Sequence, residues 1–465
     1  AQVQVCADPW TPLVEEIDPR TRRPTGLYRR TLIPAGAEDV PATPVRCRLT
    51  PTGQPAGIES SVISTALTTA PIVVESTARV GMFGARTVRL AVVKSPSADL
   101  AFGLHEIRLG GPYLTRVPAG TVLRVTGQRG DHYRVRLTPT LDAWVPLQAV
   151  TWASPTARVP HLAFTSMVVE GEATADRVSI PYAQPVPFSV EPAQGPDGRA
   201  ALHIDFYGAH CAATWITHRA SARLIREVSV HQVATGHVRV RVDLEHRRLW
   251  GWRVEPGRGS LTVVVRAPPP VDPAPALPLR GLAIALEAGH GGTSQGARGL
   301  AQVDEKEVNR LVTEGLAKEL IAVGARVVII RNGDETVSLE ERCQRTMKAN
   351  ANLFVSIHAN ASDTDRGFLR VGGASTYYKH STSRDLAVAV QAALLRRTGL
   401  PDFGCVGNFN YLPVRALTWM PAVLVEQAFL SNPVEEAKLL DGEFRKRLIA
   451  AVREGIEEFV RTRGE

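Results

Sequence analysis

The chain has 465 residues, of which 44% are hydrophobic and 22% are charged, and its formal net charge is +8. This composition is that of a folded globular protein, and the length predicts roughly three or four domains rather than one. No apolar segment approaches the roughly 18 residues that span a bilayer, so we expect no transmembrane helix. The positive charge favours an anionic partner, either nucleic acid or an anionic polymer of the cell envelope. No zinc-finger, ribonucleoprotein or basic-helix pattern supports nucleic acid, so we expect none.

The N-terminal part of the chain has the composition of β-structure. Residues 1–84 are rich in proline, threonine, alanine and arginine, and we expect a β-rich region there without a readable pattern. In residues 85–152, short apolar segments alternate with turns such as Pro118-Ala-Gly-Thr121, and Ala143-Trp-Val-Pro146 closes the unit. This order resembles a bacterial SH3-like barrel, a family whose members usually bind wall peptides or separate domains. Trp144 fits a binding surface and a core position equally well.

A second β-rich unit is expected in residues 153–267. Within it, residues 237–244 alternate valine or leucine with charged side chains, which predicts one buried and one solvated face. Trp250 and Trp252 lie two residues apart, a spacing that places both on one face of a strand. Packing in a β-core explains this pair better than sugar binding does.

A proline-rich segment over residues 268–280 separates the β-rich part from the rest of the chain. Dense proline favours an extended conformation, so we predict a stiff linker that few contacts cross. In residues 281–465, short apolar strands alternate with segments of helical periodicity. This alternation predicts an α/β domain with a mostly parallel sheet and flanking helices. The expected fold class is therefore multidomain, with all-β modules before a C-terminal α/β domain.

Two histidines and two glutamates lie at the ends of predicted elements in the α/β domain. His290 follows an apolar strand between glycines, Glu305 opens the next helix, and His358 and Glu426 end two further strands. Taken singly, His290 is explained as a solvated loop residue and Glu305 as an acid favoured by the helix dipole. Together, at the sheet edge where α/β proteins bind ligands, they match a catalytic zinc site with three ligands and a general base.

The motifs around these residues occur in the order of a known family. They are Ala-Gly-His290-Gly-Gly, Glu305-Lys-Glu-Val-Asn309, Phe354-Val-Ser-Ile-His358-Ala-Asn360, Pro413-Val-Arg415 and the segment from Pro421 through Glu426 to Asn432. In order and spacing, residues 280–462 resemble the zinc-dependent N-acetylmuramoyl-L-alanine amidases of the type-3 catalytic domain. The resemblance implies Zn²⁺ as the cofactor, His290, Glu305 and His358 as its ligands, and Glu426 as the catalytic carboxylate.

The resemblance also implies an activity. The expected enzyme is a peptidoglycan hydrolase that cleaves the amide between the lactyl group of N-acetylmuramic acid and L-alanine of the stem peptide, by zinc-activated water with a glutamate general base. Arg415, Asn360 and Arg370 are candidates for contacts with peptidoglycan, although the two arginines fit solvated surface charge equally well. Two alternatives stay open: an inactive wall-binding or scaffold protein, which the intact quartet disfavours, and a zinc peptidase of different bond specificity.

A further resemblance concerns the location of the protein. Residues 204–209, 249–252 and 259–266 resemble the β-rich modules that precede the catalytic domain in some wall amidases, which implies wall targeting. We therefore expect an exported protein in the periplasm, at the cell wall or outside the cell, with its signal peptide removed before Ala1. An activator protein is compatible with the sequence, but no motif identifies one.

Overall fold

The computed structural model describes residues 89–104, 111–159, 162–182, 184–257, 259–270, 277–362 and 370–462, together with the backbone of four strands in the first 82 residues. The chain divides into one unit of residues 1–86 and 127–132 and a second unit of residues 87–126 and 133–465. In the first unit, β1 (Val14–Ile17), β2 (Pro24–Leu32) and β3 (Thr43–Arg48) form an antiparallel sheet, and β4 (Gly81–Met82) pairs with residues 127 and 128. The rest of the β-rich region expected in residues 1–84 lies outside the described residues.

Residues 89–152 form a sheet in which the strands follow the order β11-β5-β8-β9-β10-β6-β7. Buried side chains alternate with exposed ones along these strands, for example Leu123 and Val125 in β8, so one face of the sheet forms a core. That this sheet is an SH3-like barrel stays a prediction. The elements are β5 (Arg89–Val93), β6 (Ser97–Ala101), β7 (Tyr113–Pro118), β8 (Val122–Arg129), β9 (His132–Thr138), β10 (Leu141–Pro146), the 3₁₀-helix η1 (Leu147–Ala149) and β11 (Val150–Trp152).

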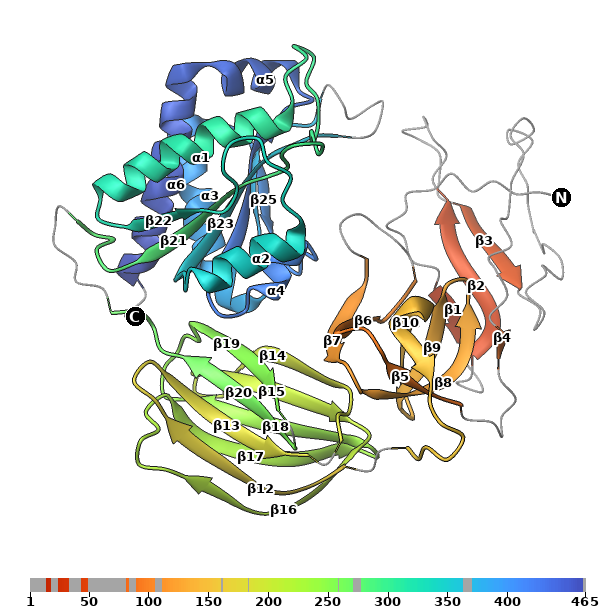
Figure 1. Ribbon diagram of the computed structural model, residues 1–465. Coiled ribbons are helices and arrows are strands. Elements are labelled where there is room, and N and C mark those ends of the chain that lie inside the picture. Colours follow the sequence, from red (N-terminus) through yellow and green to blue (C-terminus); the bar gives the residue numbers. More distant parts are fainter. Residues whose placement is uncertain are drawn as a thin grey trace, which may run out of the picture. The chain divides into compact units, whose positions relative to one another are not determined.

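Residues 162–266 form two β-sheets that share one apolar core (Figure 1). One sheet has the order β16-β12-β13-β20-β19, and the other has the order β14-β15-β18-β17. Strand β18 buries Val238, Val240, Val242 and Leu244, which confirms the predicted alternation. The strands are β12 (Leu162–Gly171), β13 (Ala175–Pro181), β14 (Phe188–Gln194), β15 (Ala200–Tyr207), β16 (Ala209–His218), β17 (Ile225–Ala234), β18 (His237–Leu244), β19 (Gly251–Pro256) and β20 (Ser260–Arg266).

The α/β part contains a six-stranded sheet with the order β22-β21-β23-β26-β24-β25. All neighbouring strands are parallel except β24 and β26, so the sheet is mostly parallel, as expected. Its central strands are buried on both faces, which explains their continuous apolar sequences. The strands are β21 (Ala283–Ala288), β22 (Arg326–Ile329), β23 (Leu353–Asn360), β24 (Ala374–Tyr377), β25 (Asp402–Val406) and β26 (Ala422–Phe429).

Helices cover both faces of this sheet (Figure 1). On one face, Leu286 and Ile357 pack against α1 (Glu305–Ala322), α3 (Arg384–Thr398) and α6 (Gly442–Arg461), with α5 (Pro433–Leu440) beside α6. On the other face, Phe354 packs near α2 (Leu339–Lys348) and α4 (Leu412–Ala416). A 3₁₀-helix, η2 (Ser381–Ser383), leads into α3.

Two strands extend further than the sequence predicted. Strands β23 and β26 continue past His358 and Glu426, so neither residue is the last of its strand. His358 pairs in register with Glu426, and the register then shifts so that Asn360 pairs with Phe429. The two strands therefore do not end at these residues but continue through an irregular pairing near the carboxyl edge of the sheet. Such irregularities change the direction in which side chains point.

The expectation that few contacts cross the proline-rich segment is wrong. Trp250 is only 4% exposed and belongs to the apolar core of the α/β part, with its ring centroid 5.8 Å from that of Phe459. Arg266, at the end of β20, donates hydrogen bonds to the carbonyl oxygens of Ala351 at 2.7 Å and Trp419 at 3.1 Å. The two-sheet part and the α/β part therefore share a packed interface, although residues 271–276 of the predicted linker lie outside the described residues.

We expect Trp250→Ala to lower the free energy of unfolding by about 3–5 kcal/mol, because it leaves a cavity in a packed core. Denaturant unfolding of the full chain measures this change. Trp215 is the matched control: it is 64% exposed, so Trp215→Ala should change the free energy of unfolding by no more than about 0.5 kcal/mol. Equal effects of the two substitutions would contradict the packed interface.

Candidate metal centre

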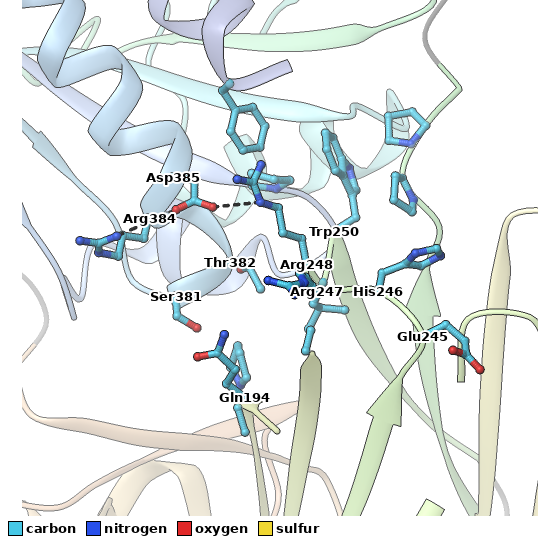
Figure 2. Close-up of a pocket in the computed structure, with 18 residues that line it drawn as sticks. Gln194, Glu245, His246, Arg247, Arg248, Trp250, Ser381, Thr382, Arg384 and Asp385 are labelled. Atoms are coloured by element: carbon cyan, nitrogen blue, oxygen red, sulfur yellow. Dashed lines mark ion pairs between the residues drawn. The ribbon is translucent and has the colours of Figure 1, made fainter. Parts of the chain in front are cut away.

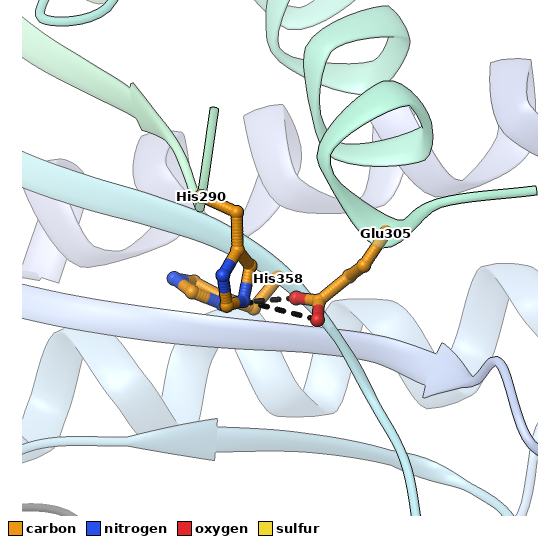
Figure 3. Close-up of side chains that lie close together, drawn as sticks. All are labelled: His290, Glu305 and His358. Atoms are coloured by element: carbon orange, nitrogen blue, oxygen red, sulfur yellow. Dashed lines mark hydrogen bonds and ion pairs between the residues drawn. The ribbon is translucent and has the colours of Figure 1, made fainter. Parts of the chain in front are cut away.

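Three side chains from three elements converge at the carboxyl edge of the sheet (Figure 3). His290 lies in the loop after β21, Glu305 is the first residue of α1, and His358 lies in β23. Nε2 of His290 is 3.0 Å from Oε2 of Glu305, and Nδ1 of His358 is 3.0 Å from Oε1 of the same carboxylate. The structure therefore brings together the three residues that the sequence suggested as zinc ligands.

Two glycines make room for the imidazole rings. A Cβ atom on Gly289 would lie 2.3 Å from Nε2 of His358, which is closer than any side chain tolerates. Gly296 has φ +73°, and a Cβ there would lie 2.5 Å from Oε2 of Glu305 and 2.7 Å from Cδ2 of His290. At Gly296 glycine supplies both the left-handed backbone and the close approach that the site needs, and at Gly289 it supplies the close approach. Gly289 and Gly296 therefore have a steric role in the site.

Backbone and side-chain donors fix the carboxylate of Glu305. Its Oε2 accepts from the amide of Ala297 at 2.9 Å, and its Oε1 accepts from the amide of Ala359 and from Nδ2 of Asn309, both at 3.1 Å. Burial raises the pKa of Glu305, but the hydrogen bonds and charges of the two histidines outweigh burial and hold that pKa well below its usual range. Glu305 is therefore an oriented anion between two imidazoles.

The donor set fits a zinc ion. Imidazole nitrogen and carboxylate oxygen are both common zinc ligands, and two ligands of one tetrahedral zinc lie roughly 3.3–3.6 Å apart. The two contacts of 3.0 Å are close to this spacing. Nε2 of His290 and Nδ1 of His358 face the same carboxylate, so they are the ring nitrogens that could bind the ion. Nε2 of His358 lies against Gly289 and forms no hydrogen bond with a described residue. The hydrogen bonds that Ala297, Asn309 and Ala359 donate to Glu305 are of the outer-sphere kind that orients metal ligands in proteins.

Glu426 lies beside His358 in the sheet. The two residues pair in register between the parallel strands β23 and β26, and Ser375 of β24 pairs with Glu426 on its other side. Neighbouring strands are about 4.7–4.9 Å apart, and in-register residues point to the same face. Glu426 is half-buried, and one of its carboxylate oxygens is buried. A fourth acid–base group therefore lies next to the three converging residues.

A buried ion pair supports the loop that carries His290. Arg342 of α2 pairs with Glu287 of β21, and both side chains are nearly inaccessible to solvent. Arg342 also donates to the carbonyl oxygens of Ala288 at 3.1 Å and His290 at 2.6 Å. Sequence analysis did not assign this pair. The sequence feature that could have indicated it is a charged residue, Glu287, inside an otherwise apolar strand.

Tyr411 joins this pair to the candidate metal centre. Its hydroxyl donates to Oε1 of Glu287 at 3.0 Å, and its ring centroid is 5.6 Å from that of His358. Burial, and then the charge of Glu287, raise the pKa of Tyr411 well above its usual value. The tyrosine therefore stays protonated and keeps donating to the buried carboxylate. This contact links the packing of His358 to the loop of His290.

The predicted substrate contacts have different surroundings. Asn360 is buried near the end of β23, and Arg370 is exposed next to a segment outside the described residues. Arg415 of α4 is 9% exposed, pairs with Asp99 of β6 at 3.1 Å and lies over the ring of Tyr113 at 3.9 Å. Arg415 is thus engaged by residues of the preceding β-sheet. Substrate contact by all three residues stays a prediction.

Comparison with known proteins identifies the family. The sequence model of the N-acetylmuramoyl-L-alanine amidase family Amidase_3 matches residues 284–458. Over 186 residues the chain is 33% identical to the uncharacterized protein YqiI of Bacillus subtilis (strain 168), and the aligned region covers 39% of this chain and 86% of YqiI. The chain belongs to the N-acetylmuramoyl-L-alanine amidase family. The matched region contains His290, Glu305, His358 and Glu426.

Two further proteins are similar to this amidase-family chain over the same part. The N-acetylmuramoyl-L-alanine amidase LytC of Bacillus subtilis (strain 168) is 34% identical over 188 residues, which are 40% of this chain but only 36% of LytC. The catalytic domain of CwlV, an N-acetylmuramoyl-L-alanine amidase from Bacillus(Paenibacillus) polymyxa var. colistinus, is 34% identical, with 39% of this chain and 98% of that domain covered and a TM-score of 0.36. The chain thus spans about a third of the length of LytC. Among the described residues, no helix combines the length and apolar composition needed to cross a membrane.

We expect Gly289→Ala to weaken zinc binding about 10–100-fold, the effect of disturbing groups that position metal ligands, because the new Cβ displaces the His358 ring. Metal analysis after dialysis against a zinc buffer measures this change. Gly442→Ala is the control, because a Cβ there approaches nothing closer than 4.0 Å. Unchanged zinc affinity in Gly289→Ala would contradict the geometry of the site.

Arg342→Met should lower the free energy of unfolding by about 3–5 kcal/mol, because it leaves the carboxylate of Glu287 buried without its charge partner. The control is Arg310→Met, which breaks surface pairs with Glu307 and Glu314 and should cost no more than about 1 kcal/mol. Chemical unfolding of metal-free protein separates this effect from zinc binding. A small effect of Arg342→Met would show that the pair does not support the fold.

Proposed function

We propose that the α/β part of this chain is a zinc-dependent peptidoglycan hydrolase. It cleaves the amide between the lactyl group of N-acetylmuramic acid and L-alanine of the stem peptide. The observation that carries the proposal is the convergence of His290, Glu305 and His358, with Glu426 in register beside His358. The family of residues 284–458 supplies the bond and the substrate class.

In this proposal His290, Glu305 and His358 hold Zn²⁺. When bound, zinc supplies Lewis acidity, which lowers the pKa of water towards neutrality and polarises a carbonyl oxygen. Two neutral imidazoles and one carboxylate leave a divalent site with net positive charge, which suits this chemistry. The chain's own task is to hold the donors in place, and the amides of Ala297 and Ala359 with the side chain of Asn309 do this for Glu305.

Glu426 is the general base in the proposed mechanism. One of its carboxylate oxygens removes a proton from the attacking water while the nitrogen of L-alanine is still bonded to the lactyl carbonyl carbon. The resulting carboxylic acid then donates this proton to that nitrogen, because the amine must be protonated to leave. The position of Glu426 beside His358 supports this role, since it places the base next to the metal ligands without making it one.

The proposal extends to the whole chain. Peptidoglycan is the partner, and the protein is exported to act in the periplasm, at the wall or outside the cell. The printed names of relatives, LytC as an amidase and LytH as a probable cell wall amidase, support this. In this proposal an SH3-like barrel and the two-sheet module hold the enzyme on the wall and raise the local substrate concentration.

We expect Glu426→Gln to reduce turnover of soluble muropeptide by roughly 10²–10⁴-fold, because the amide keeps the shape of the side chain but does not accept the proton. Zinc content and melting temperature should stay close to those of the parent. The control is Glu314→Gln, which removes a carboxylate from the exposed face of α1 and should leave the rate unchanged. A glutamine variant with nearly the parent rate would show that Glu426 is not the base.

Digestion of purified cell wall tests the bond. Newly freed L-alanine amino termini on an intact glycan strand would support the amidase proposal. Other amino termini would indicate a peptidase, and no release by zinc-loaded protein would indicate a wall-binding protein without this activity.

A further inference from the structure

A cavity lies away from the candidate metal centre along the sheet. It has a volume of about 900 Å³ and opens between the two-sheet part and the α/β part (Figure 2). Pro421, which directly precedes β26, lines it, so the cavity lies at the amino edge of the sheet. His358 and Glu426 lie near the carboxyl edge. The two sites are therefore at opposite edges of the same sheet.

Three arginines give this cavity an excess of positive charge. Arg248 is neutralised, because its Nε lies 3.3 Å from Oδ2 of Asp385. Arg384 is exposed and approaches that same carboxylate only at 4.0 Å, and Arg247 is exposed and forms no ion pair with a described residue. The other acid in the lining, Glu245, pairs with Arg199 at 2.7 Å. Arg384 therefore shares the carboxylate of Asp385 with Arg248, and Arg247 has no carboxylate partner among the described residues.

The remaining lining has the chemistry of a ligand site. Ser381 and Thr382 present hydroxyl groups beside the start of α3, as Figure 2 shows. Among the apolar residues that line it, Trp250 and Phe459 are each only 4% exposed, whereas Pro268 is exposed and Pro192 is half-buried. The volume falls in the range of about 300–1,000 Å³ that is typical of ligand pockets. Guanidinium groups bind carboxylates through paired hydrogen bonds.

We propose that this cavity is a second, non-catalytic binding site for a carboxylate-bearing muropeptide. Arg247 and Arg384 bind the carboxylates of the stem peptide, and the hydroxyls of Ser381 and Thr382 bind its polar groups. The identity of this ligand rests on the proposed function, because the substrate of the metal centre is the same polymer. A site at the opposite edge of the sheet would keep the enzyme on a wall strand while the metal centre acts on a neighbouring stem.

Calorimetric titration tests this site. The probe is a soluble muropeptide of one sugar and its stem peptide, added to the zinc-loaded full chain carrying Glu426→Gln, which prevents turnover. We expect two binding events, and we expect Arg247→Ala with Arg384→Ala to weaken one of them at least about tenfold. The control pair is Arg219→Ala with Arg396→Ala, which removes the same charge from exposed positions of the two-sheet part and α3 outside the cavity. The control should keep both events.

The outcomes separate the two proposals. If both double variants bind muropeptide equally well, the second site is overturned. It is also overturned if the cavity binds inorganic phosphate in a parallel titration but does not bind muropeptide. Hydrolysis of soluble muropeptide by the parent chain is measured independently. If the parent chain hydrolyses muropeptide but the second binding event is absent, only the cavity site is contradicted. If binding depends on Arg247 and Arg384 but the parent chain does not hydrolyse muropeptide, only the proposed function is contradicted.

Discussion

The carboxylate of Glu305 is the group on which the candidate metal centre depends. Each of its oxygens faces one imidazole at 3.0 Å, so a single side chain sets the separation of two histidines from distant parts of the chain. Three hydrogen bonds from Ala297, Ala359 and Asn309 fix the carboxylate itself. A carboxylate held in this way does not have to reorganise when a cation binds, which is how proteins position metal ligands.

A second acid, Glu287, holds the surroundings of that centre. Its pair with Arg342 is buried, and an isolated buried charge is unfavourable by several kcal/mol unless it is paired and hydrogen-bonded. Arg342 and the hydroxyl of Tyr411 meet this need, and Arg342 also binds the backbone of the His290 loop. Stability of the fold and placement of His290 therefore depend on the same interaction.

The sequence predicted the convergence of His290, Glu305 and His358 better than it predicted the packing. It places each of them near the carboxyl end of a strand or at the start of a helix, and parallel strands bring their carboxyl ends to one edge. The Glu287–Arg342 pair could not, because α2 and β21 are joined by tertiary contact and no spacing rule relates them. The contacts of Trp250 and Arg266 across the proline-rich segment were missed for a similar reason: local composition describes the stiffness of a segment but not the surfaces that it brings together.

Anomalous diffraction at the zinc absorption edge, from crystals of the zinc-loaded full chain, tests this account most directly. The account predicts one strong peak within about 2.0–2.2 Å of ring nitrogens of His290 and His358 and of an oxygen of Glu305. It also predicts that Glu426 lies beside the peak without reaching ligand distance. The account would be contradicted by a peak elsewhere in the chain or by a zinc ion bound to Glu426 in place of Glu305. It would also be contradicted if crystals grown with excess zinc showed no peak.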